Sequence, residues 1–152
     1  MALEVGSEAP DFTLVDSNGD EVTLSQFRGT PVYLNFFPAA FSGVCTPWFT
    51  SIVNNADSVE GAVVIGVSVD NKASLKAFRE SLGAEGVHFL ADFHPKGAVA
   101  QAYDCYLDQA GVAGRCTYVI DGAGMIIDVD QVVPLETPDA DRLLASLATC
   151  KV

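Results

Sequence analysis

The chain carries, at residues 31–49, the sequence PVYLNFFPAAFSGVCTPWF. Residues 32–37 form a run that is apolar except for Asn35 and has the length of a buried strand. Pro38 ends that strand, because proline has no N–H to donate to a sheet. Pro47 fits the first turn of a helix, where a missing N–H costs nothing. The stretch therefore predicts a strand, a short loop and a helix that begins near Cys45.

The position of Cys45 at the start of this helix favours a reactive thiol. Phe49, Ile52 and Val53 follow it at helical spacing, so the helix is amphipathic. At a helix N-terminus, unpaired backbone N–H groups and the helix dipole favour thiolate over thiol. A cysteine among apolar residues is also commonly a small buried hydrophobe. The residues alone leave open both a nucleophile and a core thiol.

Elsewhere in the chain, predicted strands alternate with predicted helices. The other expected strands are residues 12–15, 21–24, 62–69, 87–91, 115–120 and 125–129, the first two and the last two forming hairpins. The other expected helices are residues 71–82, 96–103 and 139–149. This order predicts an α/β fold, a mixed sheet flanked by helices. With 152 residues and 49% hydrophobic side chains, residues 1–152 are expected to form a single domain with its own core.

The charge of the chain argues against several kinds of partner. Its net charge is −12, from 20 acidic and 8 basic residues. Such a balance disfavours binding to nucleic acid or to an anionic membrane surface. The apolar runs are too short to span a bilayer, and the N-terminus lacks the pattern of a signal peptide. A cytoplasmic location is therefore expected.

The four cysteines, Cys45, Cys105, Cys116 and Cys150, are widely spaced, and the chain has only two histidines. Neither Cys-x-x-Cys nor zinc-ligand spacing occurs, so we expect no metal and no other cofactor. The same absence disfavours a thiol–disulfide oxidoreductase. In a reducing compartment these thiols are expected to be free or catalytic.

Four motifs, in order along the chain, resemble those of the peroxiredoxin family. The pattern Pro-x-x-x-Ser-x-x-Cys at residues 38–45 is similar to the peroxidatic motif of that family. The other three motifs lie at residues 9–14, 24–29 and 114–121. Residues 37–45 look most like the one-cysteine alkyl hydroperoxide reductase E group. The resemblance implies a thioredoxin-like fold with an N-terminal β-hairpin extension, and a thiol-dependent peroxidase that reduces hydrogen peroxide and alkyl hydroperoxides.

The resemblance also implies roles for particular residues. Cys45 would attack the peroxide and become a sulfenic acid, with the Ser42 hydroxyl close to the sulfur and the substrate. Arg115 would supply positive charge to the thiolate and to the developing oxyanion. Pro38 would border the pocket. The expected pocket lining is Phe37, Phe41 and Val44. Each of these residues also has a purely structural alternative. Ser42 could be a simple helix cap, Arg115 a surface arginine and the phenylalanines part of the core.

A sulfenic acid must be reduced by a second thiol. We expect a one-cysteine mechanism with an external reductant, either a thioredoxin-like or glutaredoxin-like protein or a low-molecular-weight thiol. Cys105 is the candidate for an internal resolving cysteine, whereas Cys116 should point away from the face of Arg115 by strand alternation.

Trp48 occupies a position that is usually acidic in the family. This puts in doubt a hydrogen bond that would help to position the arginine. A solvent-facing Trp48 would instead suit the interface of a homodimer. The rival hypothesis is a non-catalytic thioredoxin-fold protein that serves as a redox-sensing or binding module, and Trp48 is the residue that most favours it.

Overall fold

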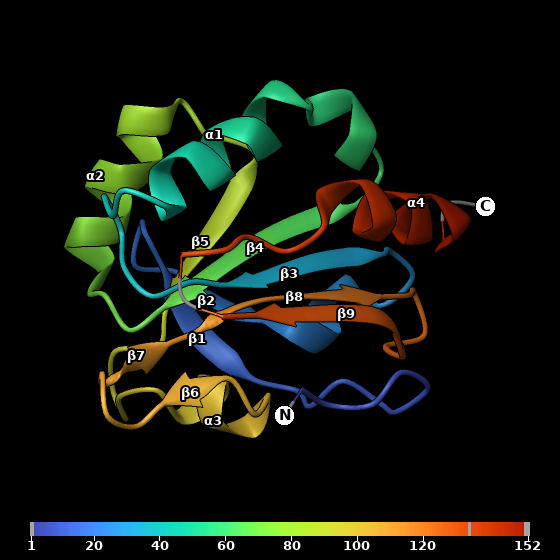
Figure 1. Cartoon of the computed structure of the whole chain (residues 1–152), viewed down its shortest axis with the longest axis horizontal. Coiled ribbons are helices and arrows are strands. Elements are labelled where there is room, and N and C mark those ends of the chain that lie inside the picture. Colours follow the sequence, from blue (N-terminus) through green and yellow to red (C-terminus); the bar gives the residue numbers. More distant parts are fainter. Residues whose placement is uncertain (1, 134, 151–152) are drawn as a thin grey trace.

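A computed structural model describes residues 2–133 and 135–150 and contains one seven-stranded sheet, in the order β2-β1-β5-β4-β3-β8-β9 (Figure 1). These strands are β1 (Thr13–Asp16), β2 (Glu21–Thr23), β3 (Val32–Phe36), β4 (Val63–Ser68), β5 (Val87–Ala91), β8 (Arg115–Ile120) and β9 (Ile126–Val132). A separate small hairpin consists of β6 (Tyr106–Leu107) and β7 (Val112–Ala113). The helices are η1 (Leu24–Phe27), α1 (Cys45–Asn54), η2 (Ala56–Val59), α2 (Lys72–Leu82), α3 (Ala98–Ala102) and α4 (Ala140–Cys150).

The strand directions bring several segments to one edge of the sheet. Strands β3, β4 and β5 are parallel, so all three end at the same edge, which we call the carboxyl edge. Strand β8 runs antiparallel to β3 and therefore begins at this edge, with Cys116 paired to Phe36. Strand β9 returns beside β8 and ends there. The N-terminal hairpin extends the sheet through pairing of β1 with β5.

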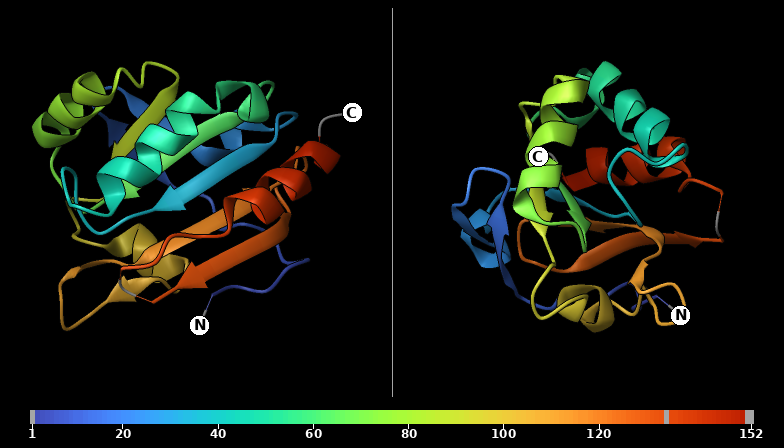
Figure 2. Two further views of the ribbon diagram at one scale, coloured as in Figure 1. Left: turned by 45° about the horizontal axis from the view of Figure 1, so that its top comes forward. Right: turned by 90° about the vertical axis from the view of Figure 1, so that its left-hand side faces the viewer.

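The two faces of the sheet have different covers (Figures 1 and 2). Helices α1, α2 and α4 lie on one face, which we call the helix face. Helix α3 and the β6–β7 hairpin lie on the other, called the tyrosine face because Tyr103 and Tyr118 are buried there. Side chains alternate along each strand. Tyr33 accordingly packs in the core of the helix face, while its neighbour Leu34 packs in the core of the tyrosine face.

Most of the predicted elements are confirmed, and the mixed α/β fold with them. Strand β5 has the predicted bounds, and Asn71 caps α2 by accepting a hydrogen bond from the Ser74 N–H, while Gly83 ends it at φ 62°. Helix α3 is shorter than predicted, because Gly97 precedes it in the left-handed conformation and Asp104 follows it at φ 55°. Strands β6 and β7, of two residues each, were not predicted. Within the described residues, no helix has the length and apolar character needed to cross a bilayer.

Candidate active site

The loop of residues 37–44 leads from β3 to α1, and Ser42 holds its end. The Ser42 hydroxyl oxygen accepts the Cys45 N–H at 3.1 Å, and the Ser42 carbonyl accepts the Thr46 N–H at 3.1 Å. Ser42 therefore accepts the first N–H groups of α1 as a helix cap does, although Val44 is the residue that directly precedes the helix. Because the hydroxyl oxygen acts as acceptor in this contact, its own hydrogen remains able to donate to another group.

The first turn of α1 leaves fewer free N–H groups than the sequence analysis expected. The N–H groups of Cys45 and Thr46 are bonded to Ser42, Pro47 has none, and the Trp48 N–H donates to the Val44 carbonyl at 3.2 Å. The expectation that unpaired N–H groups surround Cys45 is thus wrong, since the loop itself folds back to accept them. The nearest positive charge must come from a side chain.

Arg115 supplies that charge. Its Nη2 atom lies 3.7 Å from the Cys45 Sγ atom. Cys45 is fully buried, and Arg115 has an exposed fraction of only 8%. A guanidinium keeps its proton at any physiological pH, and charge interactions are strong where water is excluded. The geometry brings the predicted arginine to the predicted nucleophile, although the two lie 70 positions apart in the chain.

Trp48 does not face solvent, which contradicts the expectation from sequence. Only 6% of it is exposed, and its ring centroid lies 5.0 Å from that of Phe49. Cys45, Trp48, Phe49 and Ile52 form the buried side of α1, because positions separated by three and four residues share one helix face. Trp48 also lines a cavity of about 150 Å³ between α1 and α4. The argument for placing Trp48 in a dimer interface required a solvent-facing ring, and the ring does not face solvent.

Arg115 has one unsatisfied donor. Its Nε atom is buried and has no hydrogen-bond partner in the described part of the chain. The ion pairs found among residues 2–133 and 135–150 involve Arg28 and Arg142, and none involves Arg115. The position one helical turn after Cys45, where an acidic side chain was expected from the resemblance, holds the indole of Trp48. The one side-chain contact of Arg115 found among the described residues is therefore its contact with the Cys45 sulfur.

A buried polar pair below the site was missed by the sequence analysis. The Thr117 hydroxyl donates to the Asn35 Oδ1 atom at 2.7 Å, and the Asn35 Nδ2 group donates to the carbonyls of Tyr33 and Ile65, each at 3.2 Å. Both side chains are fully buried. Thr117 lies two residues after Arg115 and so shares its face of the strand. The signal was Asn35 itself, a polar residue inside an otherwise apolar strand.

The expected pocket residues divide into two groups. Phe37 is fully buried, with its ring centroid 4.8 Å from that of Phe49, so it belongs to the aromatic core. Pro38 and Val44 are half-buried on the loop. Phe41 is 55% exposed, and the edge of its ring contacts Phe78 with centroids 5.2 Å apart. Pro38, Phe41 and Val44 thus reach the protein surface around Cys45, whereas Phe37 does not.

Cys105 and Cys116 are both buried in the core of the tyrosine face. Burial raises the pKa of the Cys116 thiol to about 12 and raises that of Cys105 further above its ordinary value. The prediction that Cys116 points away from the site is confirmed. Cys105, the candidate internal resolving cysteine, is separated from Cys45 by the sheet, because Cys45 belongs to the core of the helix face.

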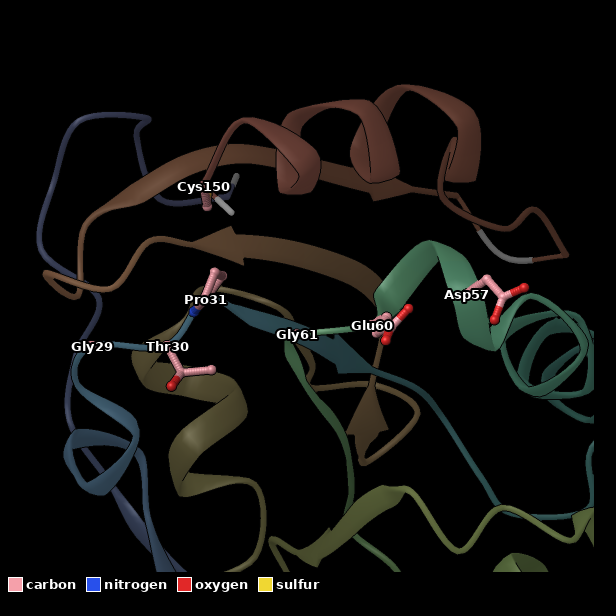
Figure 3. Close-up of a pocket in the computed structure, with 7 residues that line it drawn as sticks. All are labelled: Gly29, Thr30, Pro31, Asp57, Glu60, Gly61 and Cys150. Atoms are coloured by element: carbon pink, nitrogen blue, oxygen red, sulfur yellow. The ribbon is translucent and has the colours of Figure 1, made fainter. Parts of the chain in front are cut away.

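Cys150 lies at the opposite end of the sheet from Cys45. It lines an open depression together with Gly29, Thr30, Pro31 and Asp57 (Figure 3). Pro31 precedes β3, whereas Cys45 follows the end of that strand. A strand rises roughly 3.3 Å per residue, so the five residues of β3 separate these positions by about 17 Å. In the described residues, no second thiol stands within bonding distance of Cys45.

Comparisons with known proteins agree with this geometry. The model of the AhpC/TSA family matches residues 5–129. Alkyl hydroperoxide reductase E of Mycobacterium tuberculosis is 38% identical over 140 residues, covering 90% of this chain and 91% of that protein. Peroxiredoxin tpx1 of Schizosaccharomyces pombe is 31% identical, covering 95% and 81%. The crystal structure of peroxidoxin BcpB from M. tuberculosis superposes with a TM-score of 0.81 at 28% identity, covering 97% of each chain.

The fold and these relatives define the class of the protein as that of the peroxiredoxins, which are thiol-dependent peroxidases and hence oxidoreductases. Because the family model matches most of the sequence, the chain belongs to the AhpC/TSA family.

Proposed function

We propose that Cys45 is the peroxidatic cysteine and that it reduces hydrogen peroxide and alkyl hydroperoxides. The Cys45 thiolate attacks one oxygen of the O–O bond, which breaks. Cys45 becomes a sulfenic acid, and the other oxygen leaves as hydroxide or alkoxide and takes up a proton. The observation that carries this assignment is the 3.7 Å contact between the Arg115 guanidinium and the Cys45 sulfur.

Two other residues, Arg115 and Ser42, act on the reacting atoms in this step, and three more border the site. Arg115 stabilises the thiolate and the negative charge that develops on the leaving oxygen. The Ser42 hydroxyl, which accepts the Cys45 N–H, turns its hydrogen toward the substrate oxygen. Pro38 borders the site at the end of β3, with Phe41 and Val44 beside it. The bonding of Ser42 supports both the cap and the catalytic role, since the two use different parts of the hydroxyl.

The sulfenic acid is reduced by an external thiol. One thiol condenses with it to release water and form a mixed disulfide, and a second thiol releases Cys45 and forms the external disulfide. The reductant is a thioredoxin-like or glutaredoxin-like protein or a low-molecular-weight thiol. The placement of Cys105 and Cys116 across the sheet, and of Cys150 at its far end, supports this mechanism. The four free cysteines suit a reducing compartment such as the cytoplasm.

A homodimer joined at the carboxyl edge is the assembly that the surface supports. The large apolar side chains exposed at this edge are Phe41, Phe93, Leu107, Val133 and Leu135. Four of them lie in the loops that follow β3, β5 and β9, and Leu107 lies in the β6–β7 hairpin that leads into β8. Apolar side chains gathered at one edge suit contact with another protein surface. A second copy of the chain would cover them and enclose the site.

The test is single-turnover mixing of reduced protein with peroxide, followed by the fluorescence of Trp48, the only tryptophan in the chain. Dimedone and mass spectrometry then identify the oxidised species. We expect rapid peroxide consumption and a dimedone adduct on Cys45 alone. A stoichiometric intramolecular disulfide without an adduct would refute the one-cysteine mechanism. Peroxide consumption no faster than that of a free thiol would favour the non-catalytic redox-sensing or binding module instead.

A further inference from the structure

The loop that carries Ser42 is tied to the neighbouring strand by a single carboxylate. The Ala40 N–H donates to the Asp70 Oδ2 atom at 2.8 Å. Ala40 stands two residues before Ser42 and five before Cys45. Asp70 follows β4, whose end lies beside the end of β3 because the two strands are parallel, with Val67 paired to Phe36. The carboxylate therefore reaches the loop directly across the carboxyl edge.

The Asp70 side chain is itself held in place. The same Oδ2 atom accepts a hydrogen bond from the Ser68 hydroxyl at 2.7 Å, and the Ser68 oxygen accepts the Asp70 N–H at 3.3 Å. Ser68 is fully buried at the end of β4, and Asp70 is half-buried. Ser68, at the buried end of β4, therefore fixes the position of the Asp70 carboxylate. The carboxylate in turn fixes the position of Ala40 in the loop.

The loop needs such a restraint, because its conformation is not one that its residues favour by themselves. Phe41 adopts a φ of 63°, in the left-handed region that a residue with a Cβ atom enters at a cost. Phe41 is also more than half exposed. The ring contact with Phe78 holds Phe41 itself, the Ala40–Asp70 hydrogen bond holds the chain before it, and the bonds of Ser42 to α1 hold the chain after it.

We propose that Asp70 is a positioning residue for the peroxidase reaction. By holding Ala40, it keeps the turn at Phe41 in place and so sets where the Ser42 hydroxyl stands relative to Cys45 and Arg115. Asp70 touches none of the reacting atoms and acts through the loop. The proposal rests on the proposed function of Cys45. Catalytic geometry tolerates little displacement, since a misplacement of about 1 Å can slow a reaction by about 10²-fold.

The neighbouring residue provides a matched control. Asn71 caps α2, and its side chain accepts the Ser74 N–H at 2.9 Å, with no bond to the loop. Asp70→Ala and Asn71→Ala should both lower the melting temperature. Only Asp70→Ala should lower the second-order rate constant with hydrogen peroxide, by about tenfold or more, while Asn71→Ala stays within about twofold of the wild type. Asp70→Asn, which keeps an oxygen acceptor for Ala40, should restore most of the lost rate.

A double-mutant cycle with Ser42→Ala separates positioning from general destabilisation. If Asp70 acts by placing Ser42, the double variant should be no more than about twofold slower than Ser42→Ala alone. Fully multiplied effects would overturn the proposal. So would a wild-type rate in Asp70→Ala, an equal rate loss in Asn71→Ala, or a failure of Asp70→Asn to recover. A wild-type protein without peroxide turnover would overturn the proposed function as well, whereas these variant results leave it intact.

Discussion

Cys45 on the helix face and Cys116 on the tyrosine face are equally buried, with no exposed surface, yet only Cys45 has a charged group beside its sulfur. Cys45 has a guanidinium 3.7 Å from its sulfur. Cys116 lies among tyrosines and aliphatic side chains, and burial raises its pKa to about 12. Removal from water favours the neutral thiol, whereas a nearby positive charge or hydrogen bonds to the sulfur favour the thiolate. Burial alone therefore does not predict whether a thiol is reactive. The charge of the neighbouring groups has to be considered as well.

The largest expected effect is on the reaction itself. Cys45→Ser should abolish peroxide consumption while the protein remains folded. Cys105→Ser and Cys116→Ser should each retain the peroxidase rate within about twofold, because neither thiol is on the helix face. Stopped-flow kinetics with circular dichroism as the check on folding decides this. Peroxide turnover in purified Cys45→Ser would show that Cys45 is not the reactive thiol.

Removing the charge should make Cys45 behave more like Cys116. We expect Arg115→Met to slow peroxide attack by on the order of 10²-fold, the scale seen when a preorganised donor is lost. Arg115→Lys keeps the charge but loses the planar fork, so it should lie between Arg115→Met and the wild type. The second-order rate constant for hydrogen peroxide measures both. Equal rates in wild type and Arg115→Met would show that the contact with sulfur has no catalytic effect.

A carboxylate that pairs with Arg115 should reduce the stabilisation of the Cys45 thiolate without removing the guanidinium. Position 48 lies one helical turn after Cys45, on the same side of α1. We expect the new carboxylate of Trp48→Glu to pair with Arg115, as the family resemblance implies and as the unsatisfied Nε atom of Arg115 allows, whereas Trp48→Gln has a similar shape without the charge. Both variants lose the buried ring, so their difference isolates the charge. We expect a weaker thiolate absorbance at neutral pH, and a several-fold slower reaction, in the Glu variant than in the Gln variant.

The smallest effect concerns the stability of the tyrosine face at alkaline pH. The pKa of Cys116 rises from an ordinary 9.0 to about 12 on burial, so between these values the folded protein keeps a proton that the unfolded chain has lost. Stability contributed by this thiol is therefore complete below pH 9 and declines as pH rises, by up to about 1.4 kcal/mol per pH unit. Chemical denaturation of wild type and Cys116→Ala across this range should give a shallower decline in the variant. Parallel curves would show that Cys116 ionises as easily folded as unfolded.

Local pattern was enough to predict the elements that carry the site. Pro38 and Pro47 defined the end of β3 and the start of α1, and strand alternation placed Cys116 opposite Arg115. What could not be predicted depends on contacts between distant segments. Trp48 was expected at the surface because its neighbours in sequence do not reveal that it packs in the core of the helix face, together with residues of α4. Asp70 gave no signal, since its hydrogen bond to the loop depends on the parallel pairing of β3 with β4.

The adjacency of Arg115 and Cys116 on β8 has a consequence for how this chain tolerates insertions and deletions. Strand β8 is held in register by pairing Cys116 with Phe36 on one side and with Gln131 on the other. A slip of one residue turns every side chain of a strand to the opposite face. A length change in the preceding hairpin that moved β8 by one position would bury the guanidinium among the tyrosines and bring a second thiol toward Cys45. Insertions or deletions between α3 and β8 are therefore compatible with activity only if the β6–β7 hairpin changes its length and leaves the register of β8 unchanged.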